Sequence, residues 1–542
     1  MVRWWKLPVI AVAAILIACS APQLLAPTGG LPAFGEEIHR LEPSDVGAER
    51  FGIDFISSVD VLKNNYASLS QRYSLALQTG ANWNRWPFYW PDIEAHDGDF
   101  NFVYHDFLVN SDLARGIHVN AVLMNSPGWA TTAFQPLNEP QGVYGPTPRL
   151  GQKSPLPLEG LGVYQPTAAS PATYPPRNLY TPIFTDGTDV PGPGKVINSQ
   201  NYWARFVYDT VDHFRGRVDC WELWNEPDVK PTETNGWFGF WSGTVQDYAR
   251  LLKVGYVAAK FADSSATVMM GGMSYWCNPA FFGQLLDQIR LDPAAASNNY
   301  YFDVSAWHWY SRASQMYDMV IQTRSTLAAE GMGGKPIWVN ETGIPVWNDP
   351  TSLRQEYAGS GTMDEQASYV IQALAYGLAA GVEKSFCFQE FDDGNAEIFG
   401  LIRNSDFWPR PAYTALRVAS EYFESYTSVS KATSGNVEQI VFWGTPKGKV
   451  TVLWNKSPAN LTYVVTPTPG ATRSYLVDKA GNIVSLYPQS QGYSIFLPPA
   501  TNNNNHTGDP NDYIVGGSPY LLVEEGVPDL GRFKTYFPLL FN

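Results

Sequence analysis

Short apolar runs alternate with longer amphipathic segments through most of the chain. Eight runs of strand length occur between residues 51 and 389, and most precede a segment whose apolar residues repeat with helical periodicity. The predicted strands are Phe51–Ser57, Ala81–Pro87, His118–Asn125, Val218–Asn225, Ala266–Met273, Phe302–Trp309, Ile337–Glu341 and Lys384–Gln389. The predicted helices are 62–79, 104–115, 202–215, 245–261, 279–290, 314–330, 364–380 and 411–426. Eight such units predict an α/β protein built on a (β/α)8 TIM barrel, in which functional groups lie at the C-terminal ends of the strands.

The pattern changes after about residue 437, where short alternating runs without long helices predict a small antiparallel β domain. The predicted organisation is a signal segment (1–19), a linker (20–48), the barrel (49–428), a β-sandwich-like accessory domain (429–499) and a partly disordered tail (500–542). Within the barrel, residues 131–200 follow the third strand and hold 13 of the 41 prolines. A long loop at that place is either a wall of a substrate cleft or a surface ornament.

Charge and composition narrow the classes of function. The chain has 36 Lys plus Arg against 51 Asp plus Glu, and a formal charge of −15 repels nucleic acid and anionic lipid headgroups. It has no Gly-rich phosphate loop at a strand-to-helix junction and no His or Cys cluster at metal-ligand spacing, so we expect neither a cofactor nor a metal. Aromatic residues make up 14% of the chain, which suits either large cores or the stacking of sugar rings.

The N-terminus has the layout of a bacterial export signal. Arg3 and Lys6 precede an apolar run from Leu7 to Ala18 that is too short to span a bilayer as a mature helix. The sequence Leu16-Ile17-Ala18-Cys19 resembles a lipoprotein lipobox, which implies a lipid anchor at Cys19 and an extracellular or cell-surface location. A plain secretion signal cleaved nearby is the alternative. The other three cysteines give no disulfide framework, and we expect free thiols.

Two glutamates share one sequence design. Glu226 ends the apolar strand Trp221-Glu222-Leu223-Trp224-Asn225 before a proline, and Glu341 ends Ile337-Trp338-Val339-Asn340 before Thr342-Gly343. Two carboxylates at strand tips are what glycosidic bond cleavage requires. Taken alone, a glutamate before a proline is more often a solvated loop residue than a catalytic one.

The surrounding motifs carry a resemblance. Asn225-Glu226-Pro227 is similar to the Asn-Glu-Pro at the end of strand four in clan A glycoside hydrolases, and Asn340-Glu341-Thr342-Gly343 matches their strand-seven nucleophile. The resemblance covers about residues 50–426 and is closest in character to family 39 β-xylosidases and family 5 relatives. It implies that Glu226 is the general acid/base, that Glu341 is the nucleophile and that Asn225 forms a hydrogen bond with the sugar 2-hydroxyl.

Other positions extend the resemblance. Arg85 stands where the clan keeps an arginine near its nucleophile, and an arginine there favours the ionised carboxylate. His308 and Tyr310, in His308-Trp309-Tyr310, match a strand-six pair that lines the sugar site, and Asn125 at the end of the third strand is a further candidate ligand. At strand eight, where the clan commonly has Trp, this chain has Phe388.

Three alternatives stay open around these residues. Phe391 could replace Phe388 as the sugar platform, and Glu390 could compete with Glu341 as the carboxylate. Trp237 and Trp241 follow the acid/base motif in a stretch with Phe238 and Phe240. They serve either as sugar-stacking surfaces or as packing for the loop.

The resulting prediction is a secreted retaining glycosidase that cleaves β-linked oligo- or polysaccharides of plant or microbial origin by double displacement. Glu341 attacks the anomeric carbon, while Glu226, protonated in a less polar setting, protonates the leaving oxygen and later activates water. The alternatives are a noncatalytic carbohydrate-binding surface lipoprotein and a structural protein with a vestigial cleft.

Overall fold

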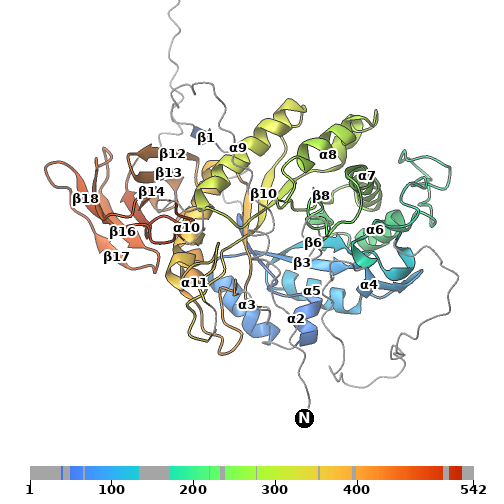
Figure 1. Cartoon of the computed structure of the whole chain (residues 1–542), viewed down its shortest axis with the longest axis horizontal. Helices are drawn as coiled ribbons and strands as arrows, with labels where there is room; N and C mark the ends of the chain where they lie inside the picture. The colour runs from blue at the N-terminus through green and yellow to red at the C-terminus, as the bar shows by residue number, and fades with distance from the viewer. Residues whose placement is uncertain are drawn as a thin grey trace, which may run out of the picture.

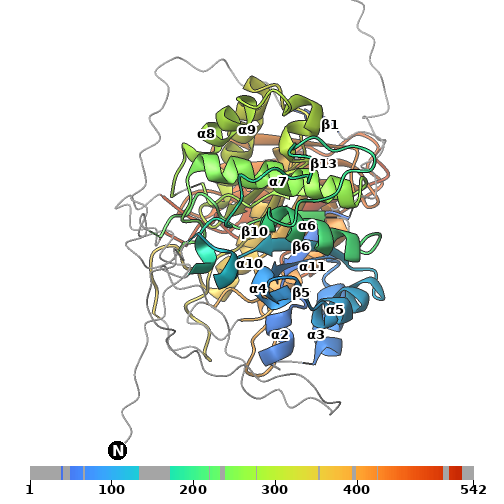
Figure 2. The same cartoon turned by 90° about the vertical axis from the view of Figure 1, so that its right-hand side faces the viewer.

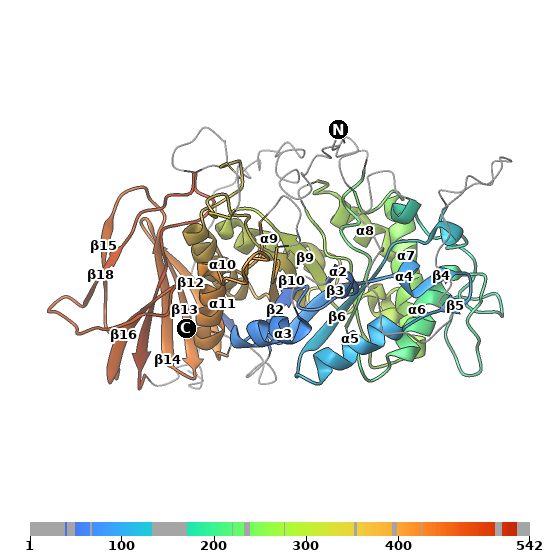
Figure 3. The ribbon, with the colours of Figure 1, turned by 90° about the horizontal axis from the view of Figure 1, so that it is seen from below.

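The molecule consists of a barrel and a β domain that lie side by side, with helices α10 and α11 between them (Figures 1 and 3). The computed structural model describes residues 38–40, 49–64, 68–132, 171–218, 220–231, 239–275, 277–351, 355–392, 398–423, 425–503 and 512–527. The predicted signal segment lies outside these residues. Among the helices in the described ranges, none has the length and apolar character needed to cross a membrane.

Eight parallel strands form the barrel in the order β8-β7-β6-β3-β2-β11-β10-β9. Their bounds are β2 Phe51–Asp54, β3 Trp83–Tyr89, β6 His118–Met124, β7 Cys220–Leu223, β8 Thr267–Met270, β9 Ser305–Trp309, β10 Ile337–Thr342 and β11 Lys384–Cys387. Parallel bridges from Met269 to Val304 and from Met273 to Trp307 join β8 to β9 and close the ring. Each strand overlaps its predicted range, so the predicted barrel is confirmed.

Helices cover the outside of the barrel (Figure 2). The main ones are α2 Val59–Asn64, α3 Leu69–Gln78, α5 Val103–Leu113, α6 Tyr202–His213, α7 Val245–Ala262, α8 Phe281–Arg290, α9 Ala313–Ala329, α10 Met363–Ala379 and α11 Pro411–Phe423. Capping boxes at Thr244 and Thr362 begin α7 and α10. The predicted helix 62–79 was wrong as a single element, because Ser68 caps a new helix by accepting a hydrogen bond from the Gln71 amide.

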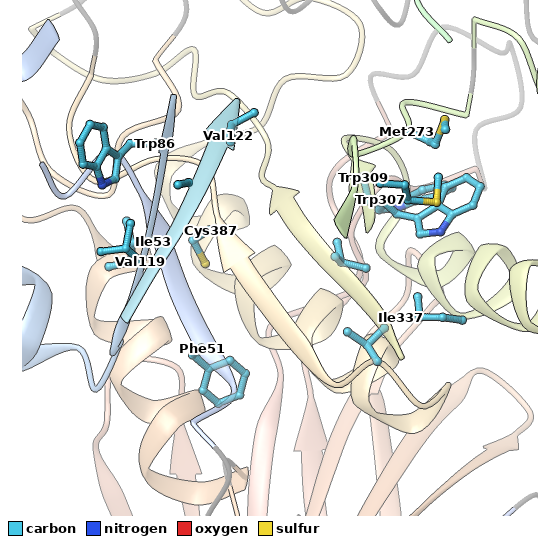
Figure 4. Packing of buried hydrophobic residues seen from close by; sticks show 14 of the residues in the cluster. Phe51, Ile53, Trp86, Val119, Val122, Met273, Trp307, Trp309, Ile337 and Cys387 are labelled. Atoms are coloured by element: carbon cyan, nitrogen blue, oxygen red, sulfur yellow. The ribbon is translucent and has the colours of Figure 1, made fainter. Parts of the chain in front are cut away.

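The two faces of the barrel strands bury different side chains. On the outer face, residues such as Ile53, Val119 and Ile337 belong to the large core beneath the helices (Figure 4). Inside the barrel, a smaller apolar cluster fills the N-terminal half. Its members are Trp83, Cys220, Met269, Val304, Ala306, Trp338 and Phe386. Gly52 leaves room for this layer, because a Cβ there would lie 2.4 Å from the Phe386 ring.

The β domain contains a seven-stranded sheet and a two-stranded hairpin sheet. The sheet order is β1-β12-β13-β14-β19-β16-β17, and β15 pairs with β18. The bounds are β1 Ile38–Arg40, β12 Ser428–Ser434, β13 Val437–Thr445, β14 Gly448–Asn455, β15 Leu461–Val465, β16 Arg473–Asp478, β17 Ile483–Ser485, β18 Tyr493–Leu497 and β19 Tyr520–Glu525. A separate core joins the two sheets, since it contains Leu453 and Leu522 of one and Val465 and Ile495 of the other.

The predicted domain limits were wrong at both ends of this domain. β1, inside the expected linker, pairs with β12, and β19, inside the expected tail, lies between β14 and β16. Both strands find their partners far along the chain, and local patterning contains no signal for such pairing.

The two units share one hydrophobic core. The Phe423 ring of α11 stacks on Phe442 of β13 with ring centroids 5.0 Å apart, and the Tyr376 hydroxyl of α10 donates to Glu438 at 2.7 Å. The β domain is therefore fixed against α10 and α11, helices that belong to the barrel.

The described part of the long 131–200 segment contacts the loops at the C-terminal end of the barrel strands and helix α7. The amide of Ser126, just after β6, donates to the Ala172 carbonyl at 3.0 Å, and the amide of Ser242 donates to the Thr173 carbonyl at 2.9 Å. Residues 172 and 173 thereby connect the loop after β6 with the loop after β7. The segment is a fixed part of the barrel rim where it is described.

Candidate active site

The predicted catalytic residues meet at the C-terminal end of the barrel, above the apolar inner layer. Arg85 lies on β3, His308 on β9 and Glu341 on β10, while Glu226 follows the end of β7. All four are at most 9% exposed. The inward-facing side chains of the barrel are therefore apolar in its N-terminal half and charged a few residues later, at its C-terminal end.

Arg85 is the hub of the group, and its guanidinium donates four hydrogen bonds to oxygen acceptors. Nε and Nη2 donate to the two oxygens of Glu222 at 2.8 and 3.0 Å. The second Nη2 hydrogen goes to Oδ1 of Asn225 at 2.8 Å. Nη1 donates to Glu341 at 2.5 Å and lies 3.5 Å from the carboxylate of Asp54. Because four hydrogen bonds to three different residues hold the guanidinium, it cannot rotate freely, and Arg85 presents a fixed charge to Glu341.

A β-bulge turns Glu341 into the barrel. Along β10 and β9, Val339 pairs with Trp307, but the next pair is Glu341 with His308, so Asn340 is the extra residue. Side chains alternate along a regular strand, so Asn340 and Glu341 would otherwise face opposite sides. The irregularity lets Asn340 donate to Glu222 at 2.8 Å while Glu341 also reaches the centre of the barrel.

The acid/base candidate sits on a strained turn. Trp224 and Glu226 have φ angles of 79° and 39°, in the left-handed region that residues with side chains rarely adopt. The turn is held because the Glu226 amide donates to the Gly272 carbonyl at 3.0 Å, while Asp228 accepts from the amide and hydroxyl of Ser274. Strain maintained by such contacts is typical of functional positions.

His308 lies between the two glutamates. Its Nδ1 is 2.8 Å from Oε1 of Glu226 and 3.3 Å from Oε2 of Glu341. Its Nε2 faces Nη2 of Arg85 at 3.4 Å, and since Arg85 can only donate, the imidazole proton belongs on Nδ1. Burial and the Arg85 charge lower the pKa of His308 well below its ordinary value, so the ring is neutral. Gly272 is required beside it, because a Cβ there would lie 2.1 Å from Nε2.

The spacing of the carboxylates matches a double-displacement pair. One oxygen of Glu226, one of Glu341 and a nitrogen of His308 all lie within 4.8 Å of one another. Retaining glycosidases hold their carboxyls about 5–5.5 Å apart, whereas inverting enzymes need roughly 6.5–9.5 Å for an intervening water. The same three groups are close enough to be cation ligands, but Nδ1–H of His308 and Nη1–H of Arg85 already direct their protons at these oxygens.

Glu341 is more difficult to ionise than an isolated glutamate. Burial raises its pKa, hydrogen bonds from Arg85 and the Tyr310 hydroxyl lower it, and the net result is a raised pKa. The arginine supports the carboxylate, as the sequence suggested, but it does not outweigh burial. Burial and the Glu341 charge also raise the pKa of Tyr310, which keeps its proton for donation.

The remaining predicted sugar ligands surround this centre. Asn225 accepts from Arg85 through Oδ1 at 2.8 Å, and its Nδ2 can act only as a donor. Asn125, 1% exposed and with φ of 67°, ends β6, and its Nδ2 has no hydrogen-bond partner among the described residues. The half-buried Phe388 ring lies 5.7 Å from the Tyr310 ring, beside the nucleophile.

Other sequence alternatives lie elsewhere. Phe391 is buried under the guanidinium of Arg72, 4.3 Å from its ring centre, and Glu390 pairs with the same arginine at 3.1 Å. Neither group reaches the catalytic carboxylates, so Phe388 and Glu341 are the better assignments. The stacking hypothesis for Trp241 was wrong, because this side chain is fully buried and its indole N–H donates to the Thr244 carbonyl. Trp237 and Phe238 lie outside the described residues.

Sequence reasoning missed Glu222, Asp54 and Asn340 as members of the site. Glu222 and Asp54 are fully buried charged residues within otherwise apolar strands. A charged side chain in such a strand is costly to bury unless it is paired. A charged residue within an apolar run was therefore the sequence signal that could have identified Glu222 and Asp54 as members of a buried ion cluster.

Several solved structures share this architecture, although no family model and no curated protein sequence matches the chain. A family 39 glycoside hydrolase from the gut symbiont Bacteroides cellulosilyticus WH2 is 18% identical, with a TM-score of 0.57 over 89% of this chain and 81% of that one. A glucosidase from Croceicoccus marinus is 12% identical, with a TM-score of 0.53 over 89% and 97% of the two chains. A family 39 β-xylosidase from Caulobacter crescentus is 14% identical, with a TM-score of 0.52 over 90% and 98%. At these identities the likeness establishes the fold, which is the one that the sequence motifs implied.

Proposed function

We propose that the protein is a retaining β-glycoside hydrolase. The observation that carries the proposal is the arrangement of Glu226 and Glu341, which contact the same nitrogen of His308 from two different strands. One carboxylate is hydrogen-bonded by Arg85 and Tyr310, and the other lies closer to Nδ1 of His308, at 2.8 Å. Different surroundings for two nearby carboxyls are the basis of separate nucleophile and acid/base roles.

In the first step, an oxygen of ionised Glu341 forms a bond to the anomeric carbon. The bond from that carbon to the leaving oxygen breaks, and the carboxyl proton of Glu226 passes to the leaving group. Arg85 and Tyr310 hold the attacking carboxylate in place, and Nδ2 of Asn225 is placed to donate to the sugar. The product of this step is a glycosyl ester of Glu341.

In the second step, Glu226 acts as a base. It takes a proton from water, whose oxygen attacks the anomeric carbon from the side the leaving group vacated, and the bond to Glu341 breaks. Two inversions give net retention. Neutral His308 donates a hydrogen bond from Nδ1–H to Glu226. This bond stabilises the negative charge that Glu226 carries after it has protonated the leaving group.

The substrate class is inferred to be β-linked oligo- or polysaccharide of plant or microbial origin. Solved proteins of the same fold include a β-xylosidase from Caulobacter crescentus and an endoxylanase from Clostridium papyrosolvens, which supports testing xylosides first. Phe388 beside Tyr310 offers a smaller platform than tryptophan for the bound sugar.

The decisive experiment compares two glutamate variants on aryl β-glycosides. Glu341→Ala should not form a glycosyl-enzyme with any leaving group. Glu226→Ala should lose about 10²–10⁴-fold in turnover. It should still accumulate the glycosyl-enzyme from activated substrates, and azide should restore turnover with a β-glycosyl azide as product.

Opposite stereochemistry would reverse the assignment. An α-azide from the Glu226 variant, or a β-azide from the Glu341 variant, would exchange the two roles. Inversion by the unmodified protein would exclude double displacement. Glu390→Gln is the matched control, because Glu390 is equally buried in the neighbouring strand region but faces Arg72, and its turnover should be retained.

A noncatalytic carbohydrate receptor is the competing function, and it predicts sugar binding without turnover of any aryl glycoside. The lipobox further supports a proposal of export with a lipid anchor at Cys19. Fractionation of a Cys19→Ala variant in a bacterial host tests it, since the variant should leave the membrane fraction. Retention there would contradict the anchor.

A further inference from the structure

Glu222 has no assigned role, yet it accepts four hydrogen bonds from groups of the site. It lies on β7, fully buried. Oε1 accepts from Nη2 of Arg85 at 3.0 Å and from the Gly272 amide at 2.9 Å. Oε2 accepts from Nε of Arg85 at 2.8 Å and from Nδ2 of Asn340 at 2.8 Å.

The four contacts identify the charge state of Glu222. Arg85, the Gly272 amide and the Asn340 amide can only donate in these contacts, so none of them can accept a proton from a carboxylic acid. A carboxylate accepts four such bonds, whereas a protonated acid would lose at least one. Glu222 is therefore the fixed negative charge of the site.

Each partner of Glu222 also holds a group that acts on the substrate. Arg85 reaches Glu341 through Nη1 and Asn225 through Nη2. Gly272, whose amide is bound by Glu222, accepts the Glu226 amide through its carbonyl at 3.0 Å. Asn340 is the bulge residue that directly precedes Glu341. One buried carboxylate thus connects the nucleophile, the acid/base and the sugar-binding asparagine.

We propose that Glu222 is the positioning residue of the glycosidase reaction: it fixes Arg85, the bulge before Glu341 and the turn of Glu226, and it sets the pH at which the nucleophile ionises. The inference rests on the proposed glycosidase function and adds a residue that does not touch substrate. If Glu222 served only the stability of the fold, its substitution would leave the pKa of Glu341 unchanged.

The electrostatic part of the proposal follows from the groups around Glu341. The charged or titratable side chains that face it in the described residues are Arg85 of β3, Asp54 of β2, Glu222 of β7, Glu226 after β7, and His308 and Tyr310 of the β9 end. The Glu222 charge raises the pKa of Glu341 and so opposes the effect of the Arg85 charge. Removing the Glu222 charge should therefore lower the pKa of the nucleophile.

The test uses Glu222→Gln and Glu222→Asp in the full chain, with aryl β-glycosides as substrates. Gln removes the charge and forces a donor against a donor, so kcat should fall by about 10²-fold, as expected when catalytic groups shift by about 1 Å. The acid limb of kcat/KM should move to lower pH. Asp keeps the charge but is one methylene short, so kcat should fall while the acid limb stays in place.

Glu94→Gln is the matched control. Glu94 is also fully buried and paired with an arginine, Arg205, but its other partners are the Trp90 indole and the Gly98 amide, outside the catalytic group. This variant should lose stability while keeping kcat and the acid limb. If Glu222→Gln behaves like Glu94→Gln, or if Glu222→Asp moves the acid limb as far as Gln does, the proposal is overturned.

A second measurement separates this proposal from the proposed function. Glu341→Gln is introduced both into the unmodified protein and into the Glu222→Gln variant. The melting temperatures of the four proteins are then measured between pH 4 and 8. The gain in stability from removing the Glu341 charge at neutral pH should be smaller in the Glu222→Gln background. This holds even if no glycoside is cleaved. An equal gain in both backgrounds would refute the electrostatic role of Glu222, whereas inactivity of the unmodified protein on all glycosides would refute the glycosidase function alone.

Discussion

Two buried ion clusters in this barrel use the same chemical groups to opposite effect. At the centre of the barrel mouth, the single guanidinium of Arg85 faces the carboxylates of Glu222, Glu341 and Asp54. Near the loops that follow β10 and β11, the carboxylate of Asp349 faces two guanidiniums, those of Arg403 and Arg410, at 2.9 and 2.7 Å. Both Asp349 and Arg410 are nearly or fully buried, as are the groups around Arg85.

The pKa values follow the ratio of cations to carboxylates. Burial opposes ionisation of Asp349, but hydrogen bonds from Arg403, Thr351 and Arg410 outweigh it and hold its pKa well below the ordinary value. Around Arg85 the balance is reversed, and burial raises the pKa of both Asp54 and Glu341. Asp392, which pairs with Arg410 alone, also has its pKa raised by burial. Asp349, held by two guanidiniums and by Thr351, has a lowered pKa, whereas carboxylates that share a single guanidinium keep a raised pKa.

The difference separates a cluster of fixed charges from the cluster at the proposed active site. The Asp349 cluster ties the loop after β10 to the loop after β11 with charges that stay fixed. The Arg85 cluster keeps an excess of carboxylates, so one of them can change its charge during a reaction.

Breaking each cluster at its arginine should have the largest effect. Arg85→Met leaves three buried carboxylates without a cation and should lower stability by about 3–5 kcal/mol. Because Glu341 and Asn225 lose their support, kcat/KM should fall by more than about 10²-fold. Arg410→Met is the matched control. It should reduce the melting temperature comparably, with kcat/KM of the folded protein within a few-fold of the parent, and equal losses of activity in both variants would erase the distinction.

Asp349→Asn tests the cluster of fixed charges through its pH dependence. The pKa of Asp349 is depressed in the folded protein, so its contribution to stability is present above the unfolded value of about 3.9 and is lost as pH falls through the folded pKa. The variant should be less stable than the parent by about 3 kcal/mol at pH 7. Thermal melts should show this gap narrowing toward pH 2. A gap that is independent of pH would mean that Asp349 acts by packing.

Glu341→Gln should have the opposite sign of effect on stability. The folded pKa of Glu341 is raised, so the parent loses stability as pH rises from about 4.3 through the folded pKa, and the neutral amide does not. The variant should be inactive but more stable by on the order of 1 kcal/mol at pH 7. Below pH 4 the two proteins should melt alike. A lower melting temperature at pH 7 would show that Arg85 stabilises the ionised nucleophile more than burial opposes it.

Phe388→Ala should have the smallest effect. The ring adjoins Tyr310 and Phe399 and is half-buried, so its loss should raise KM by a factor that corresponds to about 0.5–1.5 kcal/mol. The ring carries no charge, so its removal should leave the pKa values of Glu226 and Glu341 and the acid limb of kcat/KM unchanged. Phe391→Ala is the control, since Phe391 packs on Arg72 outside the site. It should cost stability rather than binding, and the reverse result would make Phe391 the platform.

Local patterning was sufficient for most of the barrel. Each predicted strand overlaps an observed one, because apolar runs such as Ile337–Val339 pack against helices and must be apolar whatever their partners are. The positions of Glu226 and Glu341 at strand ends followed from the same pattern. The aromatic residues were harder to assign, since Trp241 packs in the core although its sequence setting equally suits a cleft.

By itself, the sequence determined the order of strands and helices and the positions of Glu226, Glu341 and Arg85 in or just after barrel strands, since each of these features is encoded by residues close together in the chain. Only the tertiary structure decided that β19 enters the second sheet, that the bulge at Asn340 turns Glu341 inward, and that Glu222 holds Arg85. These features depend on pairing between strands far apart in sequence, and the energy of a buried charge depends on which distant groups surround it. Periodicity identifies which residues are buried, but it contains no information about which residues they meet.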